Sequence, residues 1–135
     1  MLAVDTSVLL AIFKGESAGE AWLSCLQAAA EKTALAVSSI VLAETRSFFP
    51  SHRACLDALA ELDVRHIPLD DESALLAGQI FRRYREEGGP RKVILPDFLV
   101  AAHAARQADA LATDDRGYLR RYFPTIRLVG PGKPF

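Results

Sequence analysis

Apolar residues in this chain fall into short strand-like stretches and longer segments with helical spacing. The short runs lack polar alternation, which is typical of strands covered on both faces. They lie at residues 2–4, 35–37, 64–67, 110–113 and 126–129. The helical segments lie at residues 8–13, 18–31, 51–62 and 118–122, after Ser39, from Asp70 to Gly88 and from Pro96 to Arg106. Strands that alternate with helices predict an α/β fold with a central, mostly parallel sheet and helices on both faces.

Polar residues with helix-capping chemistry mark where several of these helices begin. Thr6 and Ser7 are N-cap candidates for the first helical segment, and Ser38 and Ser39 are N-cap candidates for the third. Three consecutive acids, residues 70–72, suit the positive end of a helix dipole. The helix boundaries are therefore predictable at these three places.

Length and composition indicate one compact domain over residues 1–135. Half of the 135 residues are apolar and 24% are charged, which excludes disorder. A chain of this length buries roughly two-thirds of the surface exposed by its unfolded form, enough for a core of its own. Asp5 interrupts the first apolar run, and no run approaches the ~18 apolar residues of a membrane helix. We therefore expect a cytoplasmic protein that does not associate with membranes.

The cysteines and histidines carry no predicted chemistry. Cys25 and Cys55 lie in helical segments, where two small buried side chains are the simplest interpretation. His103 lies six residues after Asp97, about 240° round an ideal helix at ~100° per residue, so it faces away from that acid. The other two histidines have no partner at metal-ligand spacing.

Charge is distributed unevenly along the chain. The net charge is −1, which argues against indiscriminate nucleic-acid binding through bulk positive charge. Residues 1–81 nevertheless have a balance of −6, whereas residues 82–135 have a balance of +5. The basic second part can contact a phosphodiester backbone, but taken alone its charges are better explained as solvated helix faces that balance the acidic first part.

Four acids stand among apolar neighbours, where charge is costly. Asp5 and Asp115 end predicted strands. Asp97 opens a predicted helix, and Glu44 lies one turn into another. Singly, each acid has a simpler role as a helix cap or a solvated side chain. Together they can converge at the carboxyl ends of the strands, where open α/β sheets bind ligands.

Converging carboxylates have a direct electrostatic consequence. Two of them ~4 Å apart repel by ~4 kcal/mol at an effective dielectric of ~20, so a quartet needs a cation or raised pKa values at neutral pH. The set offers oxygen donors without His or Cys, which favours Mg²⁺ or Mn²⁺ over Zn²⁺. Such a site fits phosphodiester hydrolysis, in which the cation activates water and neutralises charge on the phosphate oxygens.

Four blocks, in this order and spacing, resemble the PIN-domain nucleases. They are Met1-Leu2-Ala3-Val4-Asp5-Thr6-Ser7, Ser38-Ser39-Ile40-Val41-Leu42-Ala43-Glu44, Leu95-Pro96-Asp97-Phe98-Leu99-Val100-Ala101-Ala102 and Leu111-Ala112-Thr113-Asp114-Asp115-Arg116-Gly117-Tyr118. The short length further resembles the VapC toxins of bacterial toxin–antitoxin pairs. The resemblance implies a single three-layer α/β/α domain and RNA cleavage with Mg²⁺ or Mn²⁺. It also implies frequent homodimers and inhibition by a cognate antitoxin that covers the active site.

The resemblance also assigns roles to individual residues. The matches to the family's catalytic acidic quartet are Asp5, Glu44, Asp97 and Asp115. Metal binding falls chiefly to the three aspartates of this quartet, and Glu44 either binds through water or orients the nucleophile. Ser7 matches the small hydroxyl residue beside the first acid, and Thr113 matches the one before the last. Asp114 departs from the family pattern, so Asp115 is the preferred ligand of the consecutive pair.

In this context the basic part of the chain gains a role, because RNA needs cations around an acidic centre. The candidates for substrate contact are Arg82, Arg85, Arg91, Lys92 and Arg116.

Two other α/β classes also place an Asp after the first strand. Phosphoryl-transfer enzymes of the haloacid dehalogenase type have a second Asp two residues later, where this chain has Ser7. Response-regulator receivers have an acidic pair after the first strand and an Asp after the third, where residues 64–67 run into Pro68. Both are rejected. The remaining alternative is a catalytically silent PIN-like module that binds RNA or a protein, and the intact acidic positions weigh against it.

Overall fold

The computed structural model describes residues 1–114 and 117–135 of the chain. Its strands are β1 (Leu2–Val4), β2 (Leu35–Val37), β3 (Val64–His66), β4 (Ala110–Ala112) and β5 (Leu128–Val129). Its helices are α1 (Thr6–Phe13), α2 (Gly19–Ala30), α3 (Ser39–Arg46), α4 (His52–Glu61), α5 (Asp71–Glu86), α6 (Leu95–Gln107) and α7 (Gly117–Tyr122). The alternation of strands and helices predicted by the hydrophobic pattern is confirmed.

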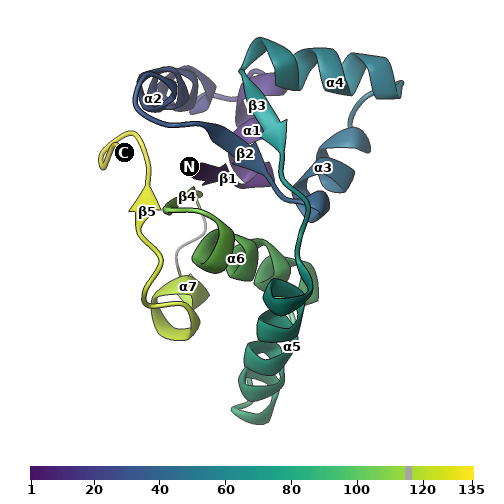
Figure 1. The fold of residues 1–135 in the computed structure, drawn as a ribbon, viewed down its shortest axis with the longest axis vertical. Coiled ribbons are helices and arrows are strands. Elements are labelled where there is room, and N and C mark those ends of the chain that lie inside the picture. Colours follow the sequence, from purple (N-terminus) through teal and green to yellow (C-terminus); the bar gives the residue numbers. More distant parts are fainter. Residues whose placement is uncertain (115–116) are drawn as a thin grey trace.

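The five strands form one parallel sheet in the order β3-β2-β1-β4-β5. The chain moves outward from β1 to β3, then crosses back to β4 and β5 on the other side of β1. Because parallel connections are almost always right-handed, this reversal sends the later helices to the opposite face of the sheet. Accordingly, α2 and α4 lie above the strands in Figure 1, and α6 and α7 lie below them. The predicted three-layer α/β/α architecture is confirmed.

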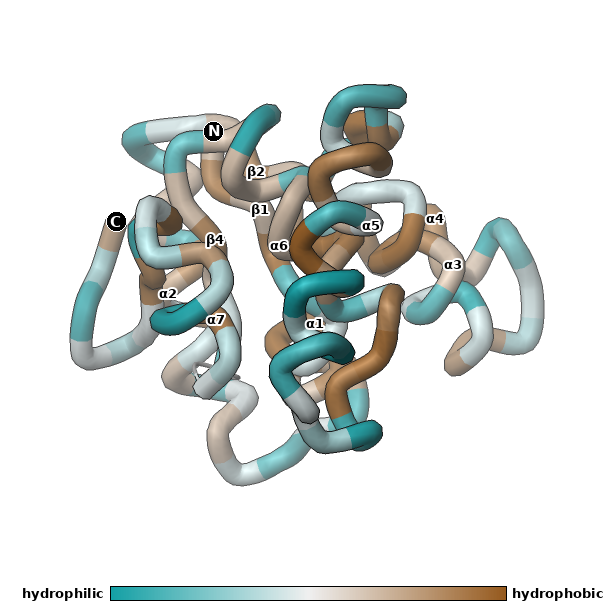
Figure 2. The backbone as a smooth tube through the Cα atoms, turned by 90° about the horizontal axis from the view of Figure 1, so that it is seen from below, coloured by the Kyte–Doolittle hydropathy of each residue, from teal (hydrophilic) through white to brown (hydrophobic). Residues whose placement is uncertain are grey.

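Apolar residues on both faces explain why the central strands are covered from both sides. In β1, Leu2 and Val4 are buried, and so is Ala3 between them, whose side chain points to the other face. In Figure 2 the chain through β1 and β4 is coloured toward the hydrophobic end of the scale, while many outer turns are hydrophilic. The carboxyl ends of the inner strands, held by this core, form the rigid edge that carries the candidate site.

Three strands are shorter than predicted. β3 ends at His66 and β4 ends at Ala112, each one residue early, and β5 begins at Leu128 although the predicted strand begins at Ile126. The Ile126 amide donates to the Phe123 carbonyl at 3.2 Å, so Ile126 belongs to the turn after α7.

The first helix begins earlier than predicted. Asp5, in extended conformation, is the N-cap of α1, and its side chain accepts a hydrogen bond from the Thr6 amide. The expectation that Thr6 or Ser7 caps this helix is wrong, because both lie inside its first turn. The cap of α3 is confirmed as Ser38, whose Oγ accepts from the Val41 amide. Asp70 caps α5 in the same way.

Helices α1 and α2 meet closely at Gly19. A Cβ atom at this position would lie 2.5 Å from the Ala11 carbonyl oxygen. Only a residue without a side chain lets α2 begin against α1 in this way. The contact fixes α1, and with it the first turn that follows Asp5.

An aromatic cluster joins the second helical layer to the sheet. Phe98 of α6 is fully buried at its centre, with ring centroids 5.1 Å from Phe81 and 5.2 Å from Tyr84. The rings of Tyr118, Tyr122 and Phe123 also lie around it, at 5.4 to 6.2 Å. Because Phe98 follows Asp97 directly, this packing anchors the start of α6 where that acid lies.

Cys25 and Cys55 are buried with free thiols, as predicted. His103 is buried as well, and its Nε2 lies 2.9 Å from the Ile67 carbonyl oxygen. Burial lowers the pKa of His103 below its usual range. His103 is therefore a core residue that faces away from Asp97, as the helical geometry predicted. Among the described helices, none has the length and apolar character needed to cross a bilayer.

Candidate active site

Three of the four predicted acids come to the carboxyl edge of the sheet. Asp5 follows β1, the central strand, and Glu44 lies on α3, which follows the neighbouring β2. Asp97 is in the first turn of α6, on the opposite face. Residues distant in the sequence therefore come to the crossover point of the sheet, where open α/β sheets bind ligands.

Three hydrogen bonds fix the Asp5 carboxylate. The Thr6 amide donates to Oδ1 at 2.8 Å. The hydroxyls of Thr113 and Ser7 donate to Oδ2 at 2.8 and 3.2 Å. Thr113 follows β4 and is almost fully buried, so its side chain links the ends of two adjacent strands. The arrangement leaves an acceptor lone pair on Oδ1, since that oxygen accepts a single one of these bonds.

Thr6 links Asp5 to Glu44. Its amide binds Asp5, and its hydroxyl donates to Oε1 of Glu44 at 2.8 Å. One residue in the first turn of α1 therefore positions a carboxylate on each of two segments. Sequence reasoning considered Thr6 only as a helix cap, and its place directly after Asp5 was the one available signal.

Asp97 is held by the turn that begins α6. The Ile94 amide donates to Oδ2 at 2.9 Å, which satisfies a donor that has no partner inside the helix. The Tyr118 hydroxyl donates to the Asp97 carbonyl oxygen at 3.1 Å. The Ile94 contact is a local capping bond between the N-cap and the third residue of α6, and Ile94 lacks the Ser or Thr side chain that marks such a capping box in a sequence. No motif indicated the Tyr118 contact, because it depends on how the start of α6 packs against α7.

The site raises the proton affinity of its acids. Burial raises the pKa of Asp5 above its usual range, and the negative charge of Asp97 raises it further. Partial burial raises the pKa of Glu44, and the charges of Asp5 and Asp97 act in the same direction. Hydrogen bonds from Thr113, Thr6 and Ser7 lower the pKa of Asp5 in part. The three acids therefore lie within electrostatic range of one another.

The described donors suit a hard divalent cation but do not enclose one. Among residues 1–114 and 117–135, no three Asp, Glu, His or Cys side chains lie close enough together to hold a metal ion. Carboxylate oxygens without nitrogen or sulfur donors are the ligands that Mg²⁺ and Mn²⁺ prefer. Mg²⁺ also keeps several waters, so it needs only one or two protein carboxylates. The donor chemistry therefore fits a cation with a largely water-filled coordination sphere.

Two predicted site residues, Asp115 and Arg116, lie outside the described residues. Asp114, the other acid of the consecutive pair, is exposed. The choice between the two acids therefore stays a prediction.

The other predicted basic residues gather at the end of α5 and in the loop that follows it. Arg82 forms an ion pair with Glu86 at 2.8 Å. The Arg85 guanidinium lies over the Phe81 ring, 5.8 Å from its centroid. Arg91 and Lys92 are exposed in the loop before α6. Of this group, Lys92 and Arg91 lie nearest in sequence to Ile94, whose amide contacts Asp97.

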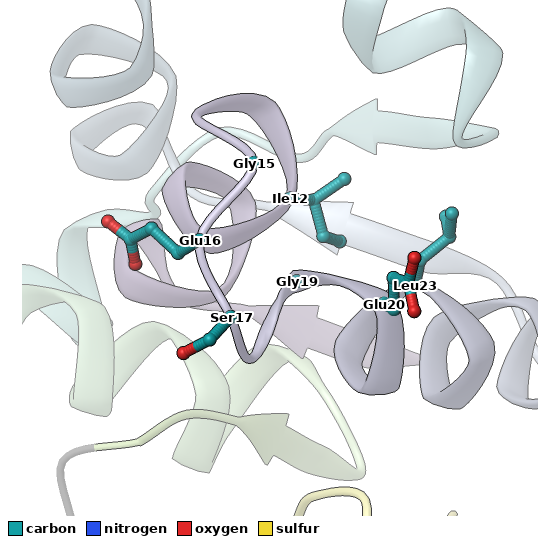
Figure 3. Close-up of a pocket in the computed structure, with 7 residues that line it drawn as sticks. All are labelled: Ile12, Gly15, Glu16, Ser17, Gly19, Glu20 and Leu23. Atoms are coloured by element: carbon teal, nitrogen blue, oxygen red, sulfur yellow. The ribbon is translucent and has the colours of Figure 1, made fainter.

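Two hollows lie away from the acids. One, of about 360 Å³, lies between α1 and α2, and Figure 3 shows Glu16 and Glu20 on opposite sides of it. The other, of about 330 Å³, lies between α3 and α4 and has a mainly apolar lining that includes His52. His52 Nδ1 accepts from Arg46 at 2.6 Å, and Ser39 Oγ lies 2.9 Å from the ring of His66. Neither hollow contains a predicted site residue.

Comparison with known proteins agrees with this architecture. The sequence profile of the PIN domain family matches residues 2–124. VapBC2 from Rickettsia felis, solved bound to a DNA fragment from its promoter, has a chain that is 22% identical, with a TM-score of 0.73 over 95% of this chain and 96% of that one. For VapBC-1 from nontypeable Haemophilus influenzae the identity is 16% and the TM-score 0.72, over 98% of both chains.

A toxin–antitoxin complex from Klebsiella pneumoniae gives 20% identity and a TM-score of 0.59, over 97% of this chain and 98% of that one. A search of curated proteins found no match. At these identities the solved structures show a shared fold and nothing more. The family profile shows membership of the family, because it spans nearly the whole chain. The chain therefore belongs to the PIN domain family.

Proposed function

We propose that this chain is a metal-dependent endoribonuclease, the toxin of a VapBC-type toxin–antitoxin pair, formed as a single nuclease domain over residues 1–135. The observation that carries the proposal is that Asp5, Glu44 and Asp97 lie within electrostatic range of one another at the carboxyl edge of the sheet, with raised pKa values for the first two. Carboxyl groups whose charged form is destabilised in this way, so that their pKa values are raised, are typical of functional sites.

Metal binding is assigned to Asp5, Asp97 and Asp115. When bound, Mg²⁺ or Mn²⁺ supplies an activated water and neutralises charge that develops on the phosphate oxygens. Ser7 and Thr113 hold the Asp5 carboxylate by two hydrogen bonds to Oδ2, and among the described residues Oδ1 accepts only the Thr6 amide. Fixed ligand orientation of this kind typically contributes 10–100-fold in metal affinity or activity.

Glu44 is assigned to the attacking water. Thr6 holds its Oε1, and among the described residues no protein donor binds its Oε2. A raised pKa brings this carboxylate closer to neutral pH, where a general base accepts a proton most effectively. Glu44 therefore either holds the water by a hydrogen bond or accepts its proton during attack.

The proposed partners are RNA as substrate, a cognate antitoxin, and a second copy of the chain in a homodimer. The antitoxin is supported by the solved relatives, which are VapBC and toxin–antitoxin complexes. The homodimer and a cytoplasmic location rest on the likeness to VapC toxins.

The test is RNA cleavage by the purified protein with Mg²⁺, with Mn²⁺ and with EDTA, on structured and unstructured RNAs. We expect cutting with either cation and none with EDTA. Cutting that survives EDTA contradicts the proposed mechanism. If no RNA is cut under any condition, the chain is instead a catalytically silent module that binds RNA or protein.

Thr113→Val tests how Asp5 is positioned. The substitution keeps the side-chain shape and removes the hydrogen bond that does most to lower the pKa of Asp5. We therefore expect the pKa of Asp5 to rise further, measured by carboxyl ¹³C NMR on the metal-free protein. Ser7→Ala should raise this pKa by less, because the Ser7 hydroxyl contributes less to lowering it. An unchanged Asp5 pKa in Thr113→Val contradicts the assigned role of Thr113.

A further inference from the structure

A hollow of about 520 Å³ lies between the end of α5 and the loop that leads into α6. We call it the α5 hollow. Its lining includes Phe81, Tyr84, Arg85, Pro90, Arg91 and Ile94. The volume is within the range of ~300–1,000 Å³ that is usual for small-molecule sites, so it admits a group of nucleotide size. The lining combines aromatic faces with two guanidinium groups.

The α5 hollow adjoins the acidic site through Ile94. The side chain of this residue lines the hollow and is 54% exposed, while its amide donates to the Asp97 carboxylate at 2.9 Å. Tyr84 ties the α5 side of the hollow to the loop, because its hydroxyl donates to the Pro90 carbonyl oxygen. A ligand in the hollow therefore contacts Ile94, the same residue whose amide positions Asp97.

The cations of the α5 hollow differ from their neighbours in how they are paired. Arg82 and Arg83 form ion pairs with Glu86 and Glu87. Among the described residues, no acid lies within ion-pair distance of Arg85 or Arg91. Two unneutralised guanidinium groups beside an acidic site suit an anion that must approach that site.

The flat surfaces of the α5 hollow suit a base as well as a phosphate. The Arg85 guanidinium already stacks over Phe81, and a base can stack on an aromatic ring or on a guanidinium plane. A base inside a double helix has both faces covered by its neighbours, so it cannot enter such a hollow. A second hollow shares Tyr84, Gly89, Pro90 and Val93 and continues past Lys92, which gives a strand a path onward. Arg121 also lines this second hollow, where Glu87 neutralises it.

We propose that the α5 hollow holds one unpaired nucleotide of the RNA, its base stacked at Phe81 and Arg85 and its phosphate at Arg91, next to the phosphodiester cut at Asp97. The proposal rests on the proposed nuclease function and adds to it a subsite for one nucleotide beside the acids. Arg82 is left out of the site, since Glu86 neutralises it.

The test measures binding of fluorescein-labelled oligouridylate by anisotropy in EDTA, which stops the proposed cleavage. The probes are the oligouridylate, the same strand with abasic sites, and a self-complementary RNA duplex. The proteins are wild type, Arg85→Ala, Arg91→Ala and, as a control, Arg53→Ala on α4, whose side chain is 86% exposed and does not line the α5 hollow. Melting temperatures confirm that each variant folds.

We expect Arg85→Ala and Arg91→Ala each to weaken oligouridylate binding about tenfold, and Arg91→Ala to reduce the salt slope by about one. Abasic sites should weaken binding to wild type and have less effect on Arg85→Ala. The duplex should bind more weakly than the single strand. Arg53→Ala should match wild type.

The inference is overturned if both α5-hollow variants bind oligouridylate as tightly as Arg53→Ala does. It is also overturned if wild type binds the duplex as tightly as the single strand. RNA cleavage with Mg²⁺ is measured on the same preparations. This assay distinguishes a wrong assignment of the α5 hollow from a wrong assignment of nuclease activity. If wild type cuts RNA while the arginine variants cut and bind normally, the α5 hollow alone is refuted. If wild type neither binds nor cuts any RNA, both proposals fall.

Discussion

Replacing Asp5 with Asn should reduce RNA cleavage by about a thousandfold while leaving the chain folded. Asn keeps one oxygen that can accept the Thr6 amide, but it lacks the negative charge that a divalent cation requires. Because Asp5 lies at the end of the central strand and receives three hydrogen bonds, no neighbour can replace it. The measurement is the single-turnover cleavage rate with saturating Mg²⁺.

The matched control is Asp57→Asn, which changes an exposed acid on α4 and should cut at the wild-type rate. The stability of the variant gives a second readout. A raised pKa means that metal-free folded protein binds more protons than the unfolded chain, so its stability falls as pH rises from the ordinary Asp range through the raised value. In EDTA at neutral pH, Asp5→Asn should therefore melt no lower than wild type. A variant that cuts RNA at the wild-type rate contradicts the assignment.

Phe98→Ala should lower the free energy of unfolding by about 3–5 kcal/mol. The Phe98 side chain is fully buried and contacts rings from α5, α7 and the turn after α7. Its removal leaves a cavity at the centre of this cluster, which the surrounding helices cannot fill without moving. A loss of this size is a large part of the ~5–15 kcal/mol typical of a domain.

Urea unfolding followed by circular dichroism measures the Phe98 effect. Phe98→Leu retains most of the apolar volume and should lose much less stability. The exposed Phe48, whose side chain contacts the Lys14 ammonium, is the matched control, and Phe48→Ala should change the unfolding free energy by less than about 1 kcal/mol. Equal losses for Phe98→Ala and Phe48→Ala would contradict the central place given to Phe98.

Most of the fold was predictable because its determinants are local. The runs at β1, β2 and β4 are short and wholly apolar, which is the pattern of strands covered on both faces. Ser38 and Asp70 each cap a helix through their own side chain, and such caps need no partner from elsewhere in the chain. Parallel topology then placed Asp5 near α3 and α6.

The remaining features depend on contacts between distant segments. Asp5 caps α1 while accepting a bond from Thr113, 108 residues away, and no local rule specifies that combination. The double role of Thr6 requires α3 to lie beside α1, and the α5 hollow requires the loop at residues 87–94 to fold over Tyr84. The lengths of β3, β4 and β5 were overestimated for the same reason, since pairing with neighbouring strands decides where a strand stops.

The central claim is that Asp5 and Asp97 hold the divalent ion used for RNA cleavage. The direct measurement is Mn²⁺ binding followed by electron paramagnetic resonance, in which bound Mn²⁺ loses the signal of the free ion. We predict saturable binding to wild type, competition by Mg²⁺, and binding weakened at least tenfold in Asp5→Asn and in Asp97→Asn. The claim would be contradicted if both variants bound Mn²⁺ as tightly as wild type, or if wild type did not bind Mn²⁺ at all.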